Sequence, residues 1–254
     1  YCRLTGCARG SIKPAATPFL DDSKDPLGVL GETEACAPAA TGRKSKSAAQ
    51  SSDSDGDEPV IFGELKRTAA KALMKFMYLA RYARFDLLRA LGALATKLTK
   101  WCDLRDRKMY RIIQHLLHSR EWRQIGFIGD PFDELELGLF TDSDFAGDRS
   151  EMESSSGVFL ALYGLRTFFP LSAVSKKQSC VSHSLVEAEL VACNAGLRQE
   201  GLPSLDLWES LLGRSVKLRL FQDNQATARI IATGKAPTLR HIKRTHQVCI
   251  AWLH

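Results

Sequence analysis

The chain has 254 residues, of which 44% are hydrophobic and 25% are charged, and its net charge is +6. This length allows one large or two small domains, and no apolar run approaches the ~18 residues that a membrane-spanning helix needs. The seven cysteines include no Cys-x-x-Cys pair, which argues against a zinc site or a disulfide framework and favours an intracellular location, in the cytoplasm or the nucleus.

The net charge conceals strong differences between segments. Residues 64–123 carry 15 basic and 5 acidic side chains, residues 124–213 carry 5 basic and 14 acidic, and residues 214–254 carry 8 basic and one acidic. Two basic segments on either side of an acidic one suit a protein that holds a polyanion beside a metal-binding pocket. Solvated helix surfaces would give the same pattern, so the charge alone leaves both interpretations open.

Residues 1–63 show no sustained hydrophobic periodicity, and much of this stretch is small, polar or charged. Such a composition cannot bury enough apolar surface to offset the backbone ordering cost of ~1–2 kcal/mol per residue. We therefore expect a disordered tether. Because the first residue is Tyr1 rather than Met, we also expect a fragment of a longer protein.

Residues 64–123 are predicted to be helical. Apolar residues recur there at three- and four-residue steps in three successive stretches, which begin near Ala69, Leu87 and Met109. Asp86 and Asp103 are candidate N-caps for the second and third helices.

The pattern changes in residues 135–254, where short apolar runs predict strands. LELGLFTD predicts a strand that ends at Asp142, and SGVFLALYG and LRTFFPLSAV predict a hairpin that turns near Gly164. Pro170 in the second hairpin segment indicates an edge strand or a bulge.

A helix is expected over about 184–200, ended by Gly201 and Pro203, with SLDLWESLLG as its continuation. VKLRLFQ then predicts a strand and NQATARIIATG a helix. This order predicts an α/β fold: a mixed sheet flanked by helices, preceded by a helical segment and a disordered N-terminal stretch.

Three acidic residues occupy positions from which they can meet. Asp142 and Asp223 each end an apolar strand, and Glu189 lies on the apolar stripe of the intervening helix. Magnesium prefers hard oxygen ligands and takes few of them from protein, and two such ions can clamp the attacking and leaving oxygens of a phosphodiester. The arrangement of strand end, helix face and strand end therefore predicts a two-metal site.

Several acidic residues of this region also have structural explanations, and Asp142 lies where Asp is an ordinary turn former. Ser184 and Glu187 fit a capping box, so we expect Glu187 to point outward near the backbone of Ser184 and favour Glu189 as the ligand. Asp223 could cap the following helix. Asp144, two residues after Asp142, leaves open a weaker alternative, an aspartate-nucleophile phosphatase.

Five segments together resemble the ribonuclease H domain of Ty1/copia-type retrotransposon Pol polyproteins. The family pattern has a DADWAG-like turn, an SKKQ loop, an EAEY helix, a CDNQSA junction and a KHID tail. Here the segments are TDSDFAGD, SKKQ, EAEL, QDNQATA and RHIK, in the same order over residues 135–250. Residues 64–123 resemble the C-terminal end of the reverse transcriptase region of the same polyprotein, and residues 12–20 resemble an earlier piece of it.

The resemblance implies a ribonuclease H-like fold that hydrolyses the RNA strand of RNA–DNA hybrids, with two Mg²⁺ ions (or Mn²⁺) and with the rest of the polyprotein as a partner. Carried over by position, the catalytic and metal-binding residues are Asp142, Glu189 and Asp223. Substrate contacts are expected from residues within the same motifs, Lys176, Lys177, Gln178, Asn224 and Gln225.

One residue departs from the family pattern. Lys243 stands in RHIK where the family has Asp. If that Asp is a fourth metal ligand, this copy is slow or inactive, and a catalytically inactive, nucleic-acid-binding relic is the main alternative. His241 and His246 lie in the same tail, but their spacing of five does not suit two metal ligands on one helix face.

Overall fold

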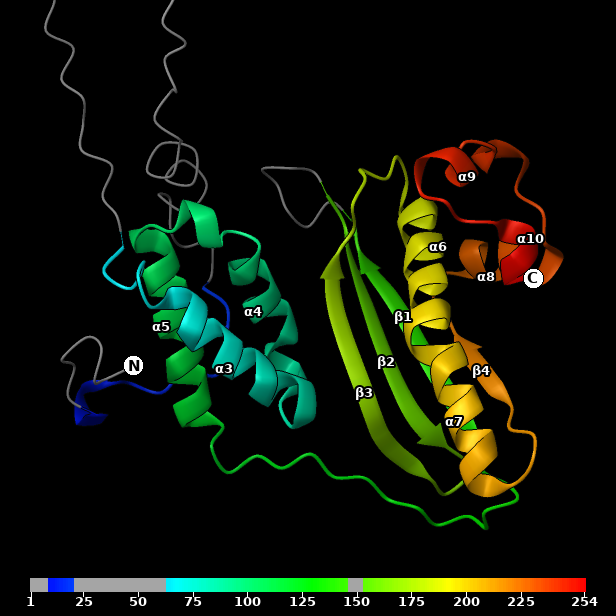
Figure 1. Cartoon of the computed structure of the whole chain (residues 1–254), viewed down its shortest axis with the longest axis horizontal. Coiled ribbons are helices and arrows are strands. Elements are labelled where there is room, and N and C mark those ends of the chain that lie inside the picture. Colours follow the sequence, from blue (N-terminus) through cyan, green and yellow to red (C-terminus); the bar gives the residue numbers. More distant parts are fainter. Residues whose placement is uncertain (1–8, 21–62, 146–152) are drawn as a thin grey trace, which may run out of the picture. The chain divides into compact units, whose positions relative to one another are not determined.

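The computed structural model describes residues 9–20, 63–145 and 153–254. The chain divides into two compact units, one formed by residues 1–76 and 93–121 and the other by residues 77–92 and 122–254 (Figure 1). No helix among the described residues is both long and apolar enough to cross a bilayer.

The segment predicted to be helical contains three α-helices, joined by the 3-10 turns Phe85–Leu87 and Leu98–Lys100: α3 (Ala69–Tyr82), α4 (Leu88–Ala95) and α5 (Asp103–His118). Their apolar stripes are buried, as the periodicity predicted. The predicted caps are wrong. Cys102, not Asp103, is the N-cap of α5, and Asp86 lies inside a 3-10 turn, where it accepts two hydrogen bonds from Arg84.

The expected N-terminal tether falls largely outside the described residues, but residues 9–20 differ from the expectation. Ile12 and Ala15 are buried, and the Ala15 N–H donates to the carbonyl of Gln114 on α5 at 3.1 Å. This stretch is therefore ordered by contacts with a helix about 100 residues further along, which its own composition could not reveal.

A mixed four-stranded sheet organises the second unit. Its strands are β1 (Glu136–Asp144), β2 (Ser155–Tyr163), β3 (Phe168–Lys177) and β4 (Leu218–Phe221), in the order β3-β2-β1-β4. The pairs β1–β2 and β2–β3 are antiparallel, whereas β1–β4 is parallel. The predicted α/β architecture, a mixed sheet flanked by helices, is confirmed.

The hairpin between β2 and β3 also follows the sequence. The Gly164 N–H donates to the Thr167 carbonyl at 3.0 Å and closes the turn. β3 is an edge strand, and the register shifts beside the pair formed by Ala161 and Pro170. A proline is tolerated there because it has no ladder hydrogen bond to donate.

The helix after the hairpin does not break at Gly201 and Pro203. Helix α6 (Leu185–Gly196) continues through a π-helical turn (Leu197–Gly201) into α7 (Leu202–Leu212). The prediction of a break was wrong because Pro203 falls in the first turn of α7, where its missing N–H costs little. Gly196 allows close approach to the sheet, since a Cβ there would lie 2.8 Å from Thr141 Cγ2.

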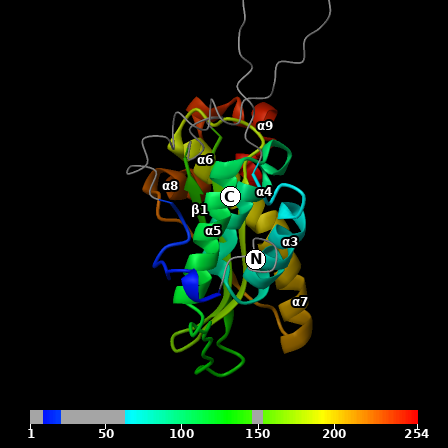
Figure 2. The ribbon, with the colours of Figure 1, turned by 90° about the vertical axis from the view of Figure 1, so that its left-hand side faces the viewer.

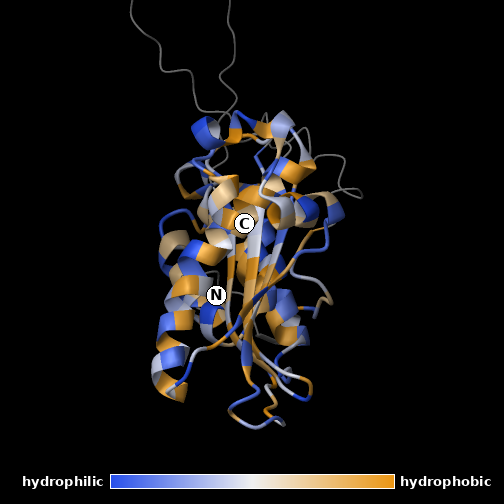
Figure 3. Cartoon of the chain, turned by 90° about the vertical axis from the view of Figure 1, so that its right-hand side faces the viewer, coloured by the Kyte–Doolittle hydropathy of each residue, from blue (hydrophilic) through white to orange (hydrophobic). Residues whose placement is uncertain are grey.

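Helices α6 and α7 run along one face of the sheet (Figure 1), and α7 and α9 (Ile242–Thr245) lie at opposite ends of this unit in both ribbon views (Figure 2). Coloured by hydropathy, the helices and strands carry both hydrophobic and hydrophilic residues (Figure 3), as expected for amphipathic elements.

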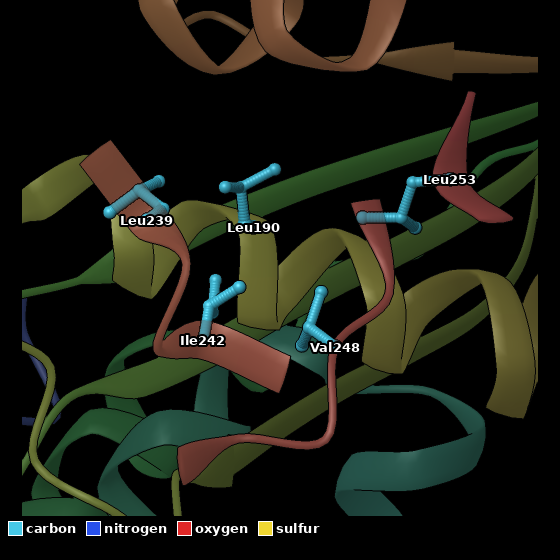
Figure 4. Close-up of a cluster of buried hydrophobic side chains, with 5 residues drawn as sticks. All are labelled: Leu190, Leu239, Ile242, Val248 and Leu253. Carbon is cyan, nitrogen blue, oxygen red and sulfur yellow. The ribbon is translucent and has the colours of Figure 1, made fainter. Parts of the chain in front are cut away.

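A third layer covers the outer side of α6. It consists of α8 (Gln225–Thr233), the 3-10 turn Pro237–Leu239, α9 and α10 (Ile250–Leu253). Gly234, at φ 64°, ends α8 in the left-handed conformation that glycine adopts without strain. Five buried side chains join this layer to α6 (Figure 4): Leu190, Leu239, Ile242, Val248 and Leu253.

Candidate metal centre

The three acidic residues singled out from the sequence come together in the second unit. One carboxylate oxygen from each of Asp142, Glu189 and Asp223 lies within 4.8 Å of the others. Asp142 and Asp223 are exposed and Glu189 is buried. The prediction that these carboxylates converge is confirmed.

The sheet brings the two aspartates together. β1 and β4 are parallel neighbours, and Phe140 is paired with Phe221. Asp142 and Asp223 each follow a member of this pair by two residues. Because parallel strands lie ≈ 4.8 Å apart and finish at the same edge, the two carboxylates meet there.

The helix that follows β4 leaves Asp223 free to act as a ligand. Its N-cap is Asn224, whose Oδ1 accepts the Thr227 N–H at 3.0 Å. The suggestion that Asp223 is the cap was therefore wrong by one residue. No described residue donates a hydrogen bond to the carboxylate of Asp142 or Asp223, so both keep their oxygens available.

Glu189, by contrast, is held tightly. Its Oε1 accepts hydrogen bonds from the N–H of Ser143 at 3.2 Å and from the Ser143 hydroxyl at 2.9 Å. Its Oε2 accepts one from Gln222 Nε2 at 3.1 Å. Residues on β1 and after β4 thus fix the carboxylate that α6 supplies.

Burial raises the pKa of Glu189 above its ordinary value, and the negative charge of Asp142 raises it further, although hydrogen bonds from Ser143 and Gln222 oppose the shift. The folded protein therefore holds this carboxylate at a cost when it is ionised. A bound cation would offset that cost.

The donor set fits a hard divalent cation. All three ligands are carboxylates, which Mg²⁺ and Mn²⁺ prefer. Two oxygens on one octahedral Mg²⁺, each at ~2.1 Å, lie at most about 4.2 Å apart. The spacing of up to 4.8 Å is therefore close to what a shared ion requires.

Glu187 was predicted to point outward, and this is wrong. Its side chain is fully buried. Ser184 caps α6 as predicted, since its Oγ accepts the Glu187 N–H at 3.2 Å, but the Glu187 carboxylate reaches back to the N–H of His183 at 2.8 Å.

Two histidines of the C-terminal layer face the same carboxylate. Glu187 Oε1 lies 3.2 Å from His241 Nε2 and 2.9 Å from His246 Nε2. The second contact has the distance of an ion pair without the alignment of a hydrogen bond. Burial alone would raise the pKa of Glu187, but the His183 N–H and the two histidines outweigh it, so the pKa is lowered. Glu187 joins α6 to the C-terminal layer.

The five residues expected to contact substrate lie in different settings. Lys176 is exposed and shares a row across the sheet with Ser156 and Ser143, so it lies about 10 Å from the strand that carries Asp142. Gln225 is exposed at the start of α8. The oxygen of Asn224 caps that helix, and no described residue accepts a hydrogen bond from its side-chain N–H₂. Lys177 pairs with Glu153 at 2.7 Å.

Gln178 does not have the position of a substrate contact. Its side chain is buried, and its Nε2 donates to Ser156 Oγ and to the Ala188 carbonyl, both at 3.0 Å. Its Oε1 accepts the hydroxyl of Ser182 at 3.2 Å. Both amide protons are used within the fold, so Gln178 links β2 to α6 instead.

Sequence reasoning missed Ser143 and Gln222, the two residues that hold Glu189. For Ser143 the sequence held a signal. Neighbouring residues of a strand point to opposite faces, so Ser143 should lie on the face opposite to Asp142, and in the structure it is buried and contacts Glu189 of α6. Gln222 gave no such signal, since its partner is 33 residues away. Asp144 is exposed and lies outside the triad, and Asp148 lies outside the described residues.

Comparison of the chain with protein-family models, with curated proteins and with solved structures finds no match.

Proposed function

We propose that the second unit hydrolyses the RNA strand of RNA–DNA hybrids, with two Mg²⁺ ions held by Asp142, Glu189 and Asp223. The observation that carries the proposal is the convergence of these three carboxylates from β1, α6 and the end of β4. The resemblance of five motifs, in order, to the ribonuclease H domain of Ty1/copia-type Pol polyproteins supports the same reaction. Mn²⁺ would serve in place of Mg²⁺ because it takes the same ligands.

Bound metal would activate a water for attack on the phosphodiester and stabilise the leaving 3′ oxygen. The residues of the chain supply the geometry for this chemistry. Ser143 and Gln222 fix the Glu189 carboxylate, so that little rearrangement is needed when the cation binds. Asp142 and Asp223, free of hydrogen bonds from the described residues, face the same point.

Substrate contacts would come from two exposed residues, Lys176 and Gln225, and from the half-buried Asn224. Lys176 would bind phosphate as a point charge, and the amides of Asn224 and Gln225 would donate to the backbone or to the 2′-hydroxyl that distinguishes RNA. We assign no substrate contact to Gln178, and Lys177 would have to leave Glu153 to take part. The proposed partners are nucleic acid and the remainder of a polyprotein, in the cytoplasm or the nucleus.

The test uses four labelled substrates with the full chain: three duplexes, which are an RNA–DNA hybrid, double-stranded RNA and double-stranded DNA, and one single-stranded RNA. The proposal expects Mg²⁺-dependent cuts in the RNA strand of the hybrid only. Cleavage of DNA or of single-stranded RNA would contradict it. Turnover of an aryl phosphate without cleavage of the hybrid would instead favour the phosphatase that Asp142 and Asp144 suggested.

A second candidate is an inactive module that binds hybrids without cutting them. Lys243 favours it, because this lysine is exposed on α9 where the family pattern has Asp. Binding of the hybrid without Mg²⁺-dependent cleavage would identify this case.

A further inference from the structure

The side chain of Gln222 joins the Glu189 carboxylate to the backbone beside Asp223. Its Nε2 donates to Glu189 Oε2 at 3.1 Å and to the sulfur of Cys193 at 3.2 Å. Its Oε1 accepts the N–H of Asn224, the residue after Asp223, at 3.0 Å. Both amide protons and the carbonyl oxygen are therefore in use, and they tie the segment after β4, which carries Asp223, to α6.

This brace is a feature of the chain itself. The CDNQSA pattern to which QDNQATA is similar has Cys at this position, and a cysteine is too short and too weak a donor to make both contacts. Without Gln222, Glu189 Oε2 would have no hydrogen bond from the described residues, and only Ser143 would hold the carboxylate.

Groups that hold a metal-binding carboxylate affect the metal strongly. Loss of such an outer-shell partner typically costs 10–100-fold in metal affinity or activity. Gln222 also keeps the Glu189 carboxylate beside Asp142 and Asp223, against the repulsion of the other two charges.

We propose that Gln222 is a positioning residue that holds Glu189 against Asp223 and so sets the affinity of the carboxylate triad for a divalent cation. The inference rests on the proposed function for the identity of the site. It adds a residue that touches neither metal nor substrate and acts through Glu189.

The test replaces Gln222 with methionine, which keeps the length and the lack of branching but donates no hydrogen bond. The matched control is Gln199→Met, the same change at an exposed position of the π-helical turn. Binding of Mn²⁺ to the full chain is measured by calorimetry in the absence of nucleic acid, and thermal unfolding is followed with and without Mn²⁺.

We expect Gln222→Met to weaken Mn²⁺ binding 10–100-fold and to reduce the rise in Tm that Mn²⁺ causes, while Gln199→Met matches the wild type in both. Unchanged Mn²⁺ affinity in Gln222→Met would overturn the inference, as would a wild type that binds no Mn²⁺.

Failure of the inference and failure of the proposed function give different results. If Gln222→Met weakens Mn²⁺ binding but the wild type cuts no hybrid, the inference about Gln222 is supported and the proposed nuclease activity is refuted. If the wild type and Gln222→Met cut hybrids at equal rates and are half-saturated at the same Mg²⁺ concentration, the proposed nuclease activity is supported and the inference about Gln222 is refuted.

Discussion

The crowding of three carboxylates predicts that Asp142→Asn stabilises the metal-free protein. Two unit charges 4.8 Å apart repel by about 0.9 kcal/mol in a water-like dielectric. Asp142 faces two such charges, in Glu189 and Asp223, and accepts no hydrogen bond from the described residues that the substitution would remove. We therefore expect the free energy of unfolding to rise by about 1–2 kcal/mol at low ionic strength, which is several degrees in Tm.

Adding Mg²⁺ should remove or reverse this difference in stability between the wild type and Asp142→Asn. At ten times the dissociation constant, a bound ion stabilises the wild type by about 1.4 kcal/mol. Asp142→Asn has lost one ligand, so Mg²⁺ should stabilise it little. The wild type should therefore unfold at a lower Tm than the variant without Mg²⁺, and at an equal or higher Tm when Mg²⁺ is added.

The assay is thermal unfolding followed by circular dichroism, with MgCl₂ or with KCl at the same ionic strength. The control is Asp206→Asn, the same change at an exposed position of α7, which should respond to Mg²⁺ as the wild type does. The reasoning is refuted if Asp142→Asn lowers Tm without Mg²⁺, or if Mg²⁺ shifts the Tm of all three proteins equally.

Four further predictions concern individual charged residues and the basic segments. Glu187→Ala should lower the free energy of unfolding by about 3 kcal/mol, measured by urea unfolding, because it leaves His246 buried without its partner; a loss below 1 kcal/mol would mean that the pair contributes little. Because the pKa of Glu189 is raised, Mg²⁺ binding measured by calorimetry should weaken as the pH falls through a value above the ordinary range of glutamate, and Glu189→Gln should remove that dependence. Lys243→Asp should raise the Mg²⁺-dependent cleavage rate, and Arg244→Asp, the same charge change on the same helix, should not; equal rates in both would show that Lys243 has no special role. Hybrid affinity should fall with salt, by roughly 0.7–0.9 in the slope of log K against log salt for each neutralised phosphate, and a flat titration would show that the basic segments are only solvated.

The triad could be predicted from sequence because each of its members has a strong local signal. Asp142 and Asp223 end apolar runs, and strand ends at one edge of a sheet are close in space. Glu189 lies on an apolar helix stripe, where an unpaired carboxylate is costly. These signals place each acid at a strand end or on a helix face, whereas the parallel pairing of β1 with β4, which brings Asp142 and Asp223 together, is seen only in the structure.

Apart from helix caps that lie one residue away from the predicted position, the contacts that sequence reasoning missed are between distant segments. Glu187 follows its cap as the local pattern predicts, yet its burial depends on histidines 54 and 59 residues away. The Gln222 brace and the packing of residues 9–20 on α5 have the same origin. Local patterns fix which element forms, whereas tertiary packing decides which polar groups it buries.

The two carboxylates of α6, Glu187 and Glu189, should affect the stability of the metal-free protein in opposite ways as the pH changes. The lowered pKa of Glu187 means that its contribution is present above the ordinary range of glutamate and is lost as the pH falls through the lowered value. The contribution of Glu189 to stability has the opposite sign, because its pKa is raised. As the pH falls and this carboxylate takes up a proton, the folded protein becomes more stable, since a neutral carboxyl group costs less to bury.

Cleavage of a labelled RNA–DNA hybrid under single-turnover conditions tests the central claim most directly. The wild type, Asp142→Asn and the control Asp206→Asn are compared in Mg²⁺, and hybrid binding is measured in parallel. The account predicts cleavage by the wild type and by Asp206→Asn, a loss of at least 100-fold in Asp142→Asn, and similar binding by all three. Cleavage that survives Asp142→Asn, or a wild type that binds the hybrid and leaves it intact, would contradict the assignment of this carboxylate triad as a nuclease centre.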